Sequence, residues 1–275
     1  MSEALRCPAC GGILTYAVRS QAVACSFCGH AELEVVPPRE DVPPPEAYLP
    51  ARVTAQAADA AFRRWAASSW WYPATLREAQ LQARLVYVPA WRVHARVESH
   101  WAGLVSAATR SGKRPRAGRA TADLWHMIPA SGALEQLELA RLQPFDEREA
   151  QPFAADEAEA AAAVLGAPWE PPAMSERRAR MLAHAAMEAD HRRRIQEHER
   201  LVRVRSSALI DDHSVRLLLV PVYLAVFRFR ERPWRCVING QSGVVVGNAP
   251  IDRLKLAGVI AVVLVLVALA LVLLR

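Results

Sequence analysis

Two cysteine pairs near the amino terminus, Cys7-Pro8-Ala9-Cys10 and Cys25-Ser26-Phe27-Cys28, decide the fold of the first part of the chain. Each Cys-x-x-Cys turn places two thiolates on the same side of a tight turn, and a glycine follows each pair. Fourteen residues separate Cys10 from Cys25, so two such turns can complete a tetrahedral site of four sulfur atoms. The pattern predicts one structural Zn²⁺ per chain, bound by Cys7, Cys10, Cys25 and Cys28.

The residues around these cysteines are typical of a small all-β zinc ribbon that occupies residues 1–36. Short strands are expected at 13–16 and 21–24, and alternating polar and apolar residues predict a third strand at 31–36. A pair of redox dithiols is the alternative, but that chemistry is typical of a βαβ context, which the sequence does not show. Four thiolates leave no open coordination position, so the metal is expected to stabilise the ribbon and to take no part in catalysis.

A proline-rich linker at 37–49 is predicted to separate the ribbon from a mixed α/β body at 50–250, which makes the whole chain α+β. Pro37-Pro38 and Pro43-Pro44-Pro45 favour a stiff, extended spacer. The body is expected to begin with a helix capped by Thr54.

A second, longer helix is predicted from a cap at Ser175 to about Val202. Its arginines alternate with acids, which favours a largely solvated helix. His184, His191 and His198 recur every seven residues and lie on one face, but they are too far apart to share one metal ion.

The segments Val88-Pro89-Ala90-Trp91 and Val220-Pro221-Val222-Tyr223 show the same order of apolar residue, proline and aromatic residue. Each lies in a predicted strand, and a proline within a strand belongs at an edge or a bulge. Duplication of a strand motif and chance similarity of two apolar strands both remain open. Asn239-Gly240 predicts a hairpin turn, and Cys236 in its first strand is expected to be buried and inert.

The carboxyl terminus contains nineteen residues, 256–274, without a charge. A helix of that length measures about 28 Å, close to the thickness of the hydrocarbon core of a bilayer, and therefore predicts a membrane span. A buried core helix is the alternative. The first residues lack the apolar segment of a signal peptide, and Arg253 and Lys255 precede the predicted span. We therefore expect a tail-anchored, single-pass protein of the cell (inner) membrane, with its body in the cytoplasm and its last helix in the lipid bilayer.

The formal net charge of +6 suits either anionic lipid headgroups or nucleic acid. Five of the basic residues are expected in one loop, which is either solvated or in contact with lipid headgroups or an acidic partner. These residues are Arg110, Lys113, Arg114, Arg116 and Arg119. No phosphate-binding glycine loop, nucleophile elbow or His-Glu-x-x-His motif is present in the sequence, so we expect no enzymatic activity and no small-molecule substrate.

These features together resemble a group of bacterial membrane-anchored proteins whose zinc ribbon is similar to that of transcription factor IIB. The resemblance covers most of the chain and is carried by the following segments in addition to the terminal apolar run: Cys7-Pro8-Ala9-Cys10-Gly11, Val88-Pro89-Ala90-Trp91, Leu142-Gln143-Pro144-Phe145-Asp146, Val220-Pro221-Val222-Tyr223 and Val237-Ile238-Asn239-Gly240-Gln241-Ser242-Gly243. Such proteins are often labelled as similar to the primosomal helicase PriA, but this chain has no ATPase motifs. The resemblance implies a role beside flotillin-like and phage-shock proteins in membrane-stress or scaffold assemblies.

The sequence therefore favours a non-enzymatic, membrane-anchored zinc-ribbon adaptor that presents a protein-binding module at the cytoplasmic face of the membrane. Its partner would be a cytoplasmic or membrane-associated protein. The alternative is a membrane-tethered zinc-ribbon protein that binds nucleic acid. The charges of the ribbon count against this alternative, because Arg6 and Arg19 are outnumbered by Glu3, Glu32 and Glu34.

Overall fold

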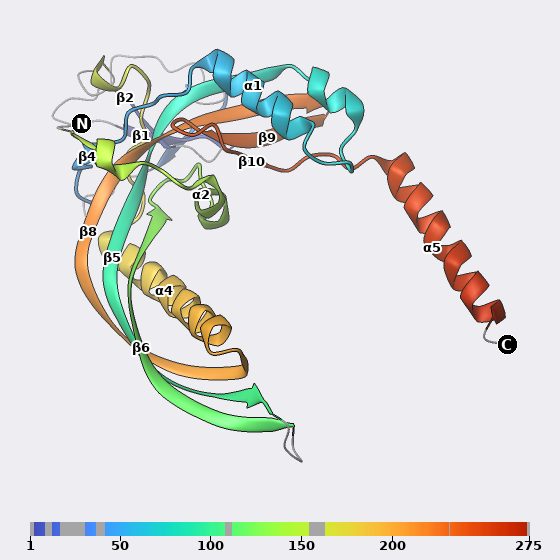
Figure 1. Ribbon diagram of the computed structural model, residues 1–275. Coiled ribbons are helices and arrows are strands. Elements are labelled where there is room, and N and C mark those ends of the chain that lie inside the picture. The colour runs from blue at the N-terminus through green and yellow to red at the C-terminus, as the bar shows by residue number, and fades with distance from the viewer. Residues whose placement is uncertain are drawn as a thin grey trace. The chain divides into compact units, whose positions relative to one another are not determined.

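The computed structural model of the protein describes residues 3–8, 13–16, 31–36, 42–107, 112–153, 163–230 and 232–273 (Figure 1). The chain forms two compact units, each built from segments that are distant in sequence. Unit 1 consists of Met1–Pro50, Val86–Arg141 and Asp146–Pro221, and unit 2 consists of Ala51–Leu85, Leu142–Phe145 and Val222–Arg275. The fold is mixed α/β, with seven strands assigned to one large sheet and three to a separate small sheet.

The small sheet in unit 1 has the order β2-β1-β3 and is antiparallel throughout. Its central strand β1 (Glu3–Arg6) was not predicted. Strand β2 (Ile13–Tyr16) confirms the predicted strand at 13–16, and β3 (Glu34–Val36) is shorter than the strand expected at 31–36. The strand predicted at 21–24 lies outside the described residues.

Three long strands dominate the large sheet. Strand β5 (Leu81–Ser106) pairs with β6 (Lys113–Pro129) in an antiparallel ladder and also pairs with β8 (Leu201–Phe229). The two prolines of the similar segments, Pro89 and Pro221, lie in β5 and β8. Pro89 directly precedes Ala90, where the pairing of β5 with β6 begins, and Pro221 directly precedes Val222, where the pairing of β8 with β9 begins. The missing backbone N–H of a proline is least costly at such a position.

Part of the predicted linker belongs to this sheet. Strand β4 (Ala47–Tyr48) pairs in parallel with β8 and in an antiparallel manner with β7 (Gln151–Pro152). Ala47 and the following Leu49 are buried. The end of the proline-rich segment is therefore a fixed strand and not a solvated spacer.

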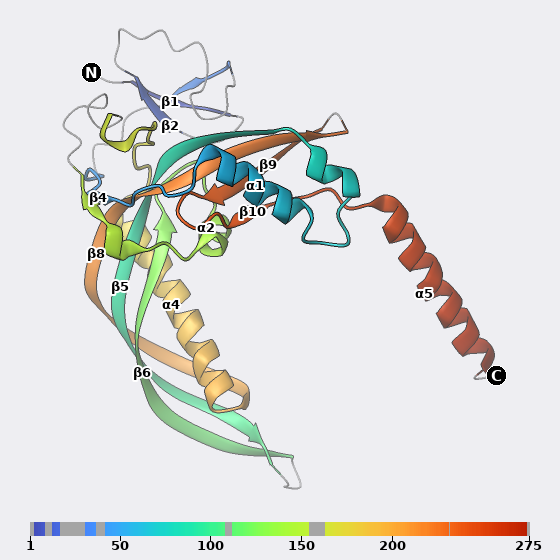
Figure 2. The ribbon, with the colours of Figure 1, turned by 45° about the horizontal axis from the view of Figure 1, so that its top comes forward.

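The long helix α4 (Glu176–His198) lies along β5 and β6 within unit 1 (Figures 1 and 2). Five of its residues recur every fourth position and are buried: Ala179, Ala183, Met187, His191 and Ile195. The first three pack in one core with Trp91, Val93, Ala95 and Val97 of β5. The prediction of a largely solvated helix is therefore wrong for this face, because a stripe of mostly small and apolar side chains provides enough contact area for the sheet.

Short helices complete the connections of the chain. A 3₁₀ helix η1 (Ala74–Glu78) precedes β5, and α2 (Gln136–Leu142) follows β6. A second 3₁₀ helix, η2 (Glu147–Glu149), leads into β7.

Unit 2 has its own core. Helix α1 (Ala55–Ala66) begins as predicted, because the Thr54 side chain accepts a hydrogen bond from the Ala57 amide at 3.2 Å. Phe62 of α1 packs against Phe227 of β8, with ring centroids 5.0 Å apart.

The predicted hairpin in unit 2 is confirmed. Strands β9 (Arg232–Asn239) and β10 (Val245–Gly247) are antiparallel. Cys236 is fully buried opposite Gly247, and burial raises the pKa of its thiol to about 12. The thiol is therefore neutral at physiological pH, which confirms the prediction of a buried, inert cysteine.

The predicted membrane span is contradicted by the structure. Helix α5 (Arg253–Leu273) begins before the uncharged stretch, so its first turn includes Arg253 and Lys255. The Lys255 ammonium group donates hydrogen bonds to the backbone oxygens of Trp70 (2.9 Å) and Tyr72 (3.0 Å) of unit 2. Within the described residues, no helix combines the length and the apolar character that a membrane crossing requires.

Several predictions are corrected together with that span. The transmembrane helix at 256–274, the tail anchor, the lipid contact of the last helix and the inner-membrane location with a cytoplasmic body are wrong. The fold class that included the span is replaced by a mixed α/β fold with one large sheet.

Candidate functional site

The cysteine site can be followed in the structure only at Cys7. This residue comes directly after β1 and is fully buried. The other predicted ligands, Cys10, Cys25 and Cys28, lie outside the described residues. Among the residues that the structure does describe, no group of three or more His, Cys, Asp or Glu side chains is arranged to hold a metal ion. The zinc ribbon is therefore corrected to what is observed, a three-stranded antiparallel sheet with a buried cysteine at the end of its central strand.

The small sheet offers an edge for binding. In the order β2-β1-β3, strand β3 pairs with β1 on one side and forms the outer strand of the sheet. Its residue Val35 is 68% exposed, and Glu34 beside it is also exposed. An outer strand presents backbone N–H and C=O groups that can accept another strand, and an exposed β-branched side chain favours such a contact.

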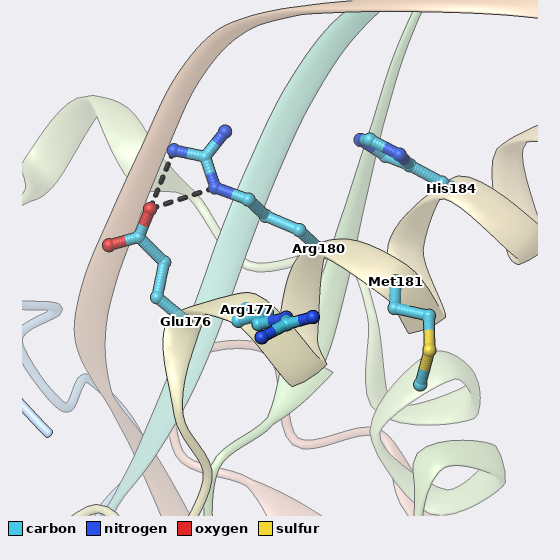
Figure 3. A pocket seen from close by; sticks show the side chains of 5 residues that line it. All are labelled: Glu176, Arg177, Arg180, Met181 and His184. Carbon is cyan, nitrogen blue, oxygen red and sulfur yellow. Dashed lines mark hydrogen bonds and ion pairs between the residues drawn. The ribbon is translucent and has the colours of Figure 1, made fainter. Parts of the chain in front are cut away.

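A pocket of about 650 Å³ lies over the first turns of α4 (Figure 3). The helical spacing brings its lining residues to one side: Glu176, Arg177, Arg180, Met181 and His184. Met181 is 63% exposed and provides the apolar part of the surface. The pocket was not predicted from the sequence, where these residues were interpreted as part of a solvated helix.

The polar side of the pocket is a hydrogen-bonded network. Arg180 donates from Nε (2.8 Å) and Nη2 (2.5 Å) to Glu176 Oε1, and from Nη1 (2.5 Å) to Asp212 Oδ2 on β8. The hydrogen bond with Glu176 makes the largest contribution to the raised pKa of Arg180. Asp212 Oδ1 lies 2.7 Å from His184 Nε2. A histidine held by a carboxylate can bind a polar ligand or serve as a general base, and the described lining of this pocket adds two arginines, a glutamate and a methionine to it.

A second histidine pair also has the geometry of a catalytic dyad. Ser99 Oγ of β5 lies 2.8 Å from His191 Nδ1 of α4. Their exposed fractions are only 1% and 3%, so a substrate cannot reach the hydroxyl. Burial, with a smaller contribution from Arg194, lowers the pKa of His191. The pair therefore satisfies two buried polar groups inside the core, which the four-residue spacing of His191 from Met187 and Ile195 could have indicated.

The predicted basic loop is mostly a strand. Lys113, Arg114, Arg116 and Arg119 all lie on β6, and Arg110 is outside the described residues. Arg116 forms an ion pair with Glu199 at 2.8 Å, and Arg119 pairs with Glu98 of β5. Strand pairing fixes the backbone of these arginines, so they do not form the solvated loop that the sequence indicated.

Comparison with protein-family models, with curated proteins and with solved structures gives no significant match. The resemblance to zinc-ribbon proteins therefore remains a prediction that rests on the sequence motifs alone.

Proposed function

We propose that this chain is a non-enzymatic adaptor that binds a partner protein through its amino-terminal three-stranded sheet. The observation that carries the proposal is the outer strand β3, which exposes Val35 to 68% and is paired on one side only among the described strands. A partner strand that paired with β3 would bury this side chain and satisfy backbone groups of both chains.

The four cysteines support the same proposal. Cys7 is buried at the end of the central strand, as expected for a metal ligand in a module too small for an extensive core. Cys10, Cys25 and Cys28 would complete a set of four thiolates, the donor set typical of closed structural zinc sites. The metal would hold together the segments that carry the four cysteines and so maintain the binding edge of the small sheet.

The chemistry of the described side chains favours binding over catalysis. Ser99 and His191 form a nucleophile-base pair that is inaccessible, and the accessible His184–Asp212 pair has no hydroxyl or thiol beside it in the described lining of its pocket. An adaptor needs neither arrangement to react. It needs a surface that stays folded while one edge accepts a partner.

The proposal is tested with full-length variants used as bait in chemical cross-linking from cells. Val35→Lys should abolish capture of the partner, because a charge on an outer strand opposes strand addition. Val202→Lys is the matched control, because Val202 is 49% exposed at the start of β8, in the large sheet and not in the small one, and should leave capture unchanged. Partners that cross-link equally to both variants would overturn the assignment of β3 as the binding edge.

Metal content provides the second arm of the test. The wild-type chain should contain one zinc ion by elemental analysis, and the Cys7→Ser/Cys28→Ser variant should lose both the metal and the partner. A chain that retains its zinc after both substitutions would contradict the assignment of the ligands.

A further inference from the structure

The sheet of unit 1 has one face turned away from α4. Along β5, alternate residues point to opposite faces of the sheet. Val93, Ala95 and Val97 share a core with α4, so Arg92, His94 and Arg96 lie on the opposite face. We refer to this opposite side as the outer face.

Three aromatic rings lie in a row across the outer face. His94 of β5 is directly opposite Trp125 of β6 in the strand register. On the third strand, β8, the ring of His213 lies with its centroid 5.2 Å from that of His94. These three residues, called the aromatic row below, come from three neighbouring strands in the order β6-β5-β8.

The two ends of the aromatic row are accessible. Trp125 is 41% exposed, and the side chain of His213 is 42% exposed. The Arg92 guanidinium carbon lies 5.8 Å from the centroid of the Trp125 ring, which supports the orientation of the indole. Large aromatic side chains are costly to expose, so an accessible indole held in place beside a second ring indicates a stacking surface.

Cations lie along the same face: Arg96 is two residues from His94 on β5, whereas Arg205 and Arg203 are further along β8, roughly 26–33 Å from His213 at about 3.3 Å per residue. On β8, Ser206 and Asp212 contact α4, so the alternating Arg203 and Arg205 point to the outer face with His213. Neither they nor Arg96 form an ion pair with any residue that the structure describes.

Two acids of the outer face are in ion pairs with arginines. Glu98 pairs with Arg119, and Glu147 pairs with Arg92. Asp123 and Asp211 are exposed acids of this face without such an arginine among the described residues. Asp123 lies opposite Arg96 in the strand register, and its Oδ1 is 3.5 Å from His213 Nε2, a ring that is charged only when protonated. The three arginines that are not in ion pairs therefore exceed the unpaired acids, and the face is complementary to a polyanion.

We propose that the outer face binds single-stranded nucleic acid, with bases stacked on the aromatic row and phosphates bound by Arg96, Arg203 and Arg205. Aromatic side chains on neighbouring strands of a sheet provide adjacent stacking positions for unpaired bases, and arginines further along the same face bind the backbone of a strand several nucleotides long. A duplex hides the faces of its bases, and an acidic peptide supplies carboxylates without a series of planar rings. The single strand is the polyanion that uses both features of this face.

The test measures fluorescence anisotropy of labelled twelve-nucleotide oligo(dT) and oligo(rU) with the full-length protein. The wild type should bind both single strands, more weakly as salt increases, and should bind a duplex of equal length less tightly. Trp125→Ala should weaken binding about tenfold, and Trp125→Tyr should restore most of it, because stacking needs a ring at this position. Arg205→Ala should reduce the dependence of affinity on salt.

Trp70→Ala is the matched control, because Trp70 is 60% exposed and belongs to unit 2, outside the aromatic row. It should leave the affinity unchanged while far-ultraviolet circular dichroism shows that both variants are folded. Absence of binding by the wild type, or equal losses in the two tryptophan variants, would overturn the proposal.

Two further outcomes would contradict the proposal by indicating another ligand or another site. Stronger binding of labelled poly-glutamate than of oligo(dT) would assign the outer face to acidic polypeptides. Oligonucleotide binding that survives Trp125→Ala but is lost in Cys7→Ser would assign the nucleic-acid-binding site to the small sheet β2-β1-β3. Because the adaptor proposal is tested at Val35 and this one at Trp125, the failure of either is distinguishable from the failure of the other.

Discussion

The side chain of Asn239 donates a hydrogen bond to the carbonyl oxygen of Leu142 at 2.8 Å, although 97 residues separate the two along the chain. The same amide nitrogen lies 3.2 Å from the Pro144 oxygen, and its Oδ1 accepts from the amides of Gln241 (2.7 Å) and Ser242 (3.0 Å). Every hydrogen-bonding position of this buried side chain is therefore used. One asparagine holds the hairpin turn and the segment at 142–145 together within unit 2.

Replacing Asn239 by leucine should destabilise unit 2 severely. The substitution leaves two buried amides and two carbonyl oxygens without this partner, and we expect a loss of about 2–5 kcal/mol in the free energy of unfolding. Urea denaturation followed by circular dichroism measures the loss. Asn248→Leu at an exposed position nearby should change stability little, and a comparable loss there would show that Asn239 has no special role.

Gly247 should tolerate no side chain. A Cβ atom at this position would lie 2.5 Å from Cys236 Cβ and 2.8 Å from Cys236 Cα, so relief requires movement of the β9 backbone. Gly247→Ala should therefore reduce the free energy of unfolding by about 1–3 kcal/mol. Gly258→Ala is the matched control in α5, because nothing lies within 4 Å of the added atom. A melting temperature that falls equally in both variants would contradict the steric explanation.

Asp212→Asn should loosen α4 from β8. The carboxylate of Asp212 accepts from Arg180 and lies within hydrogen-bond distance of His184, and a neutral amide cannot accept from both with two oxygens. We expect a loss of about 1–3 kcal/mol in stability. The adjacent exposed Asp211 provides the control, since Asp211→Asn should be nearly neutral in the same denaturation experiment. Equal effects would mean that charge, and not the bridge to α4, decides stability.

Stability should fall as pH decreases through the range in which histidine titrates. Burial lowers the pKa of both His191 and His126 in the folded protein, so the unfolded chain binds these protons first as the solution is acidified. Their contribution to stability is fully present above the unfolded pKa of about 6.5 and is lost as pH falls through the lower folded values. Denaturation curves between pH 7.5 and about pH 5 measure this slope.

The histidine substitutions separate the sources of that slope. His191→Gln should reduce the dependence of stability on pH, because the buried site no longer titrates. His100→Gln is the control for the substitution itself, since its side chain is 71% exposed. A slope that is the same in all three proteins would show that other groups cause the loss of stability in acid.

Local features of the fold were predictable from the sequence, and pairings between distant segments were not. The Thr54 cap, the hairpin after Cys236 and the strand at 13–16 depend on neighbouring residues, and all three are confirmed. Strand β4 depends on Ala47 pairing with Leu218, which no local pattern indicates. Helix α5 was misinterpreted because composition alone does not show where a helix begins or what binds its first turn.

The candidate binding surfaces show the same difference between local features, which were predictable, and pairings of distant segments, which were not. Alternation along β5 could indicate that Arg92, His94 and Arg96 share a face, but their alignment with Trp125 depends on strand register. Register is determined by the loop between the strands and by the core beneath them. His191 was expected on a largely solvated helix and is buried, because the burial of α4 depends on the width of the sheet that covers it.

Full burial of Cys236 provides an internal measure of folding for each variant of unit 2 described above. A thiol whose pKa is about 12 is almost entirely protonated in neutral solution, and alkylating reagents attack the thiolate. Brief treatment of the native chain with iodoacetamide should therefore leave Cys236 unmodified, whereas a partly opened unit 2 should gain one extra mass increment. Intact-mass spectrometry would then report, in a single spectrum, whether a substitution had altered a contact or had opened the unit.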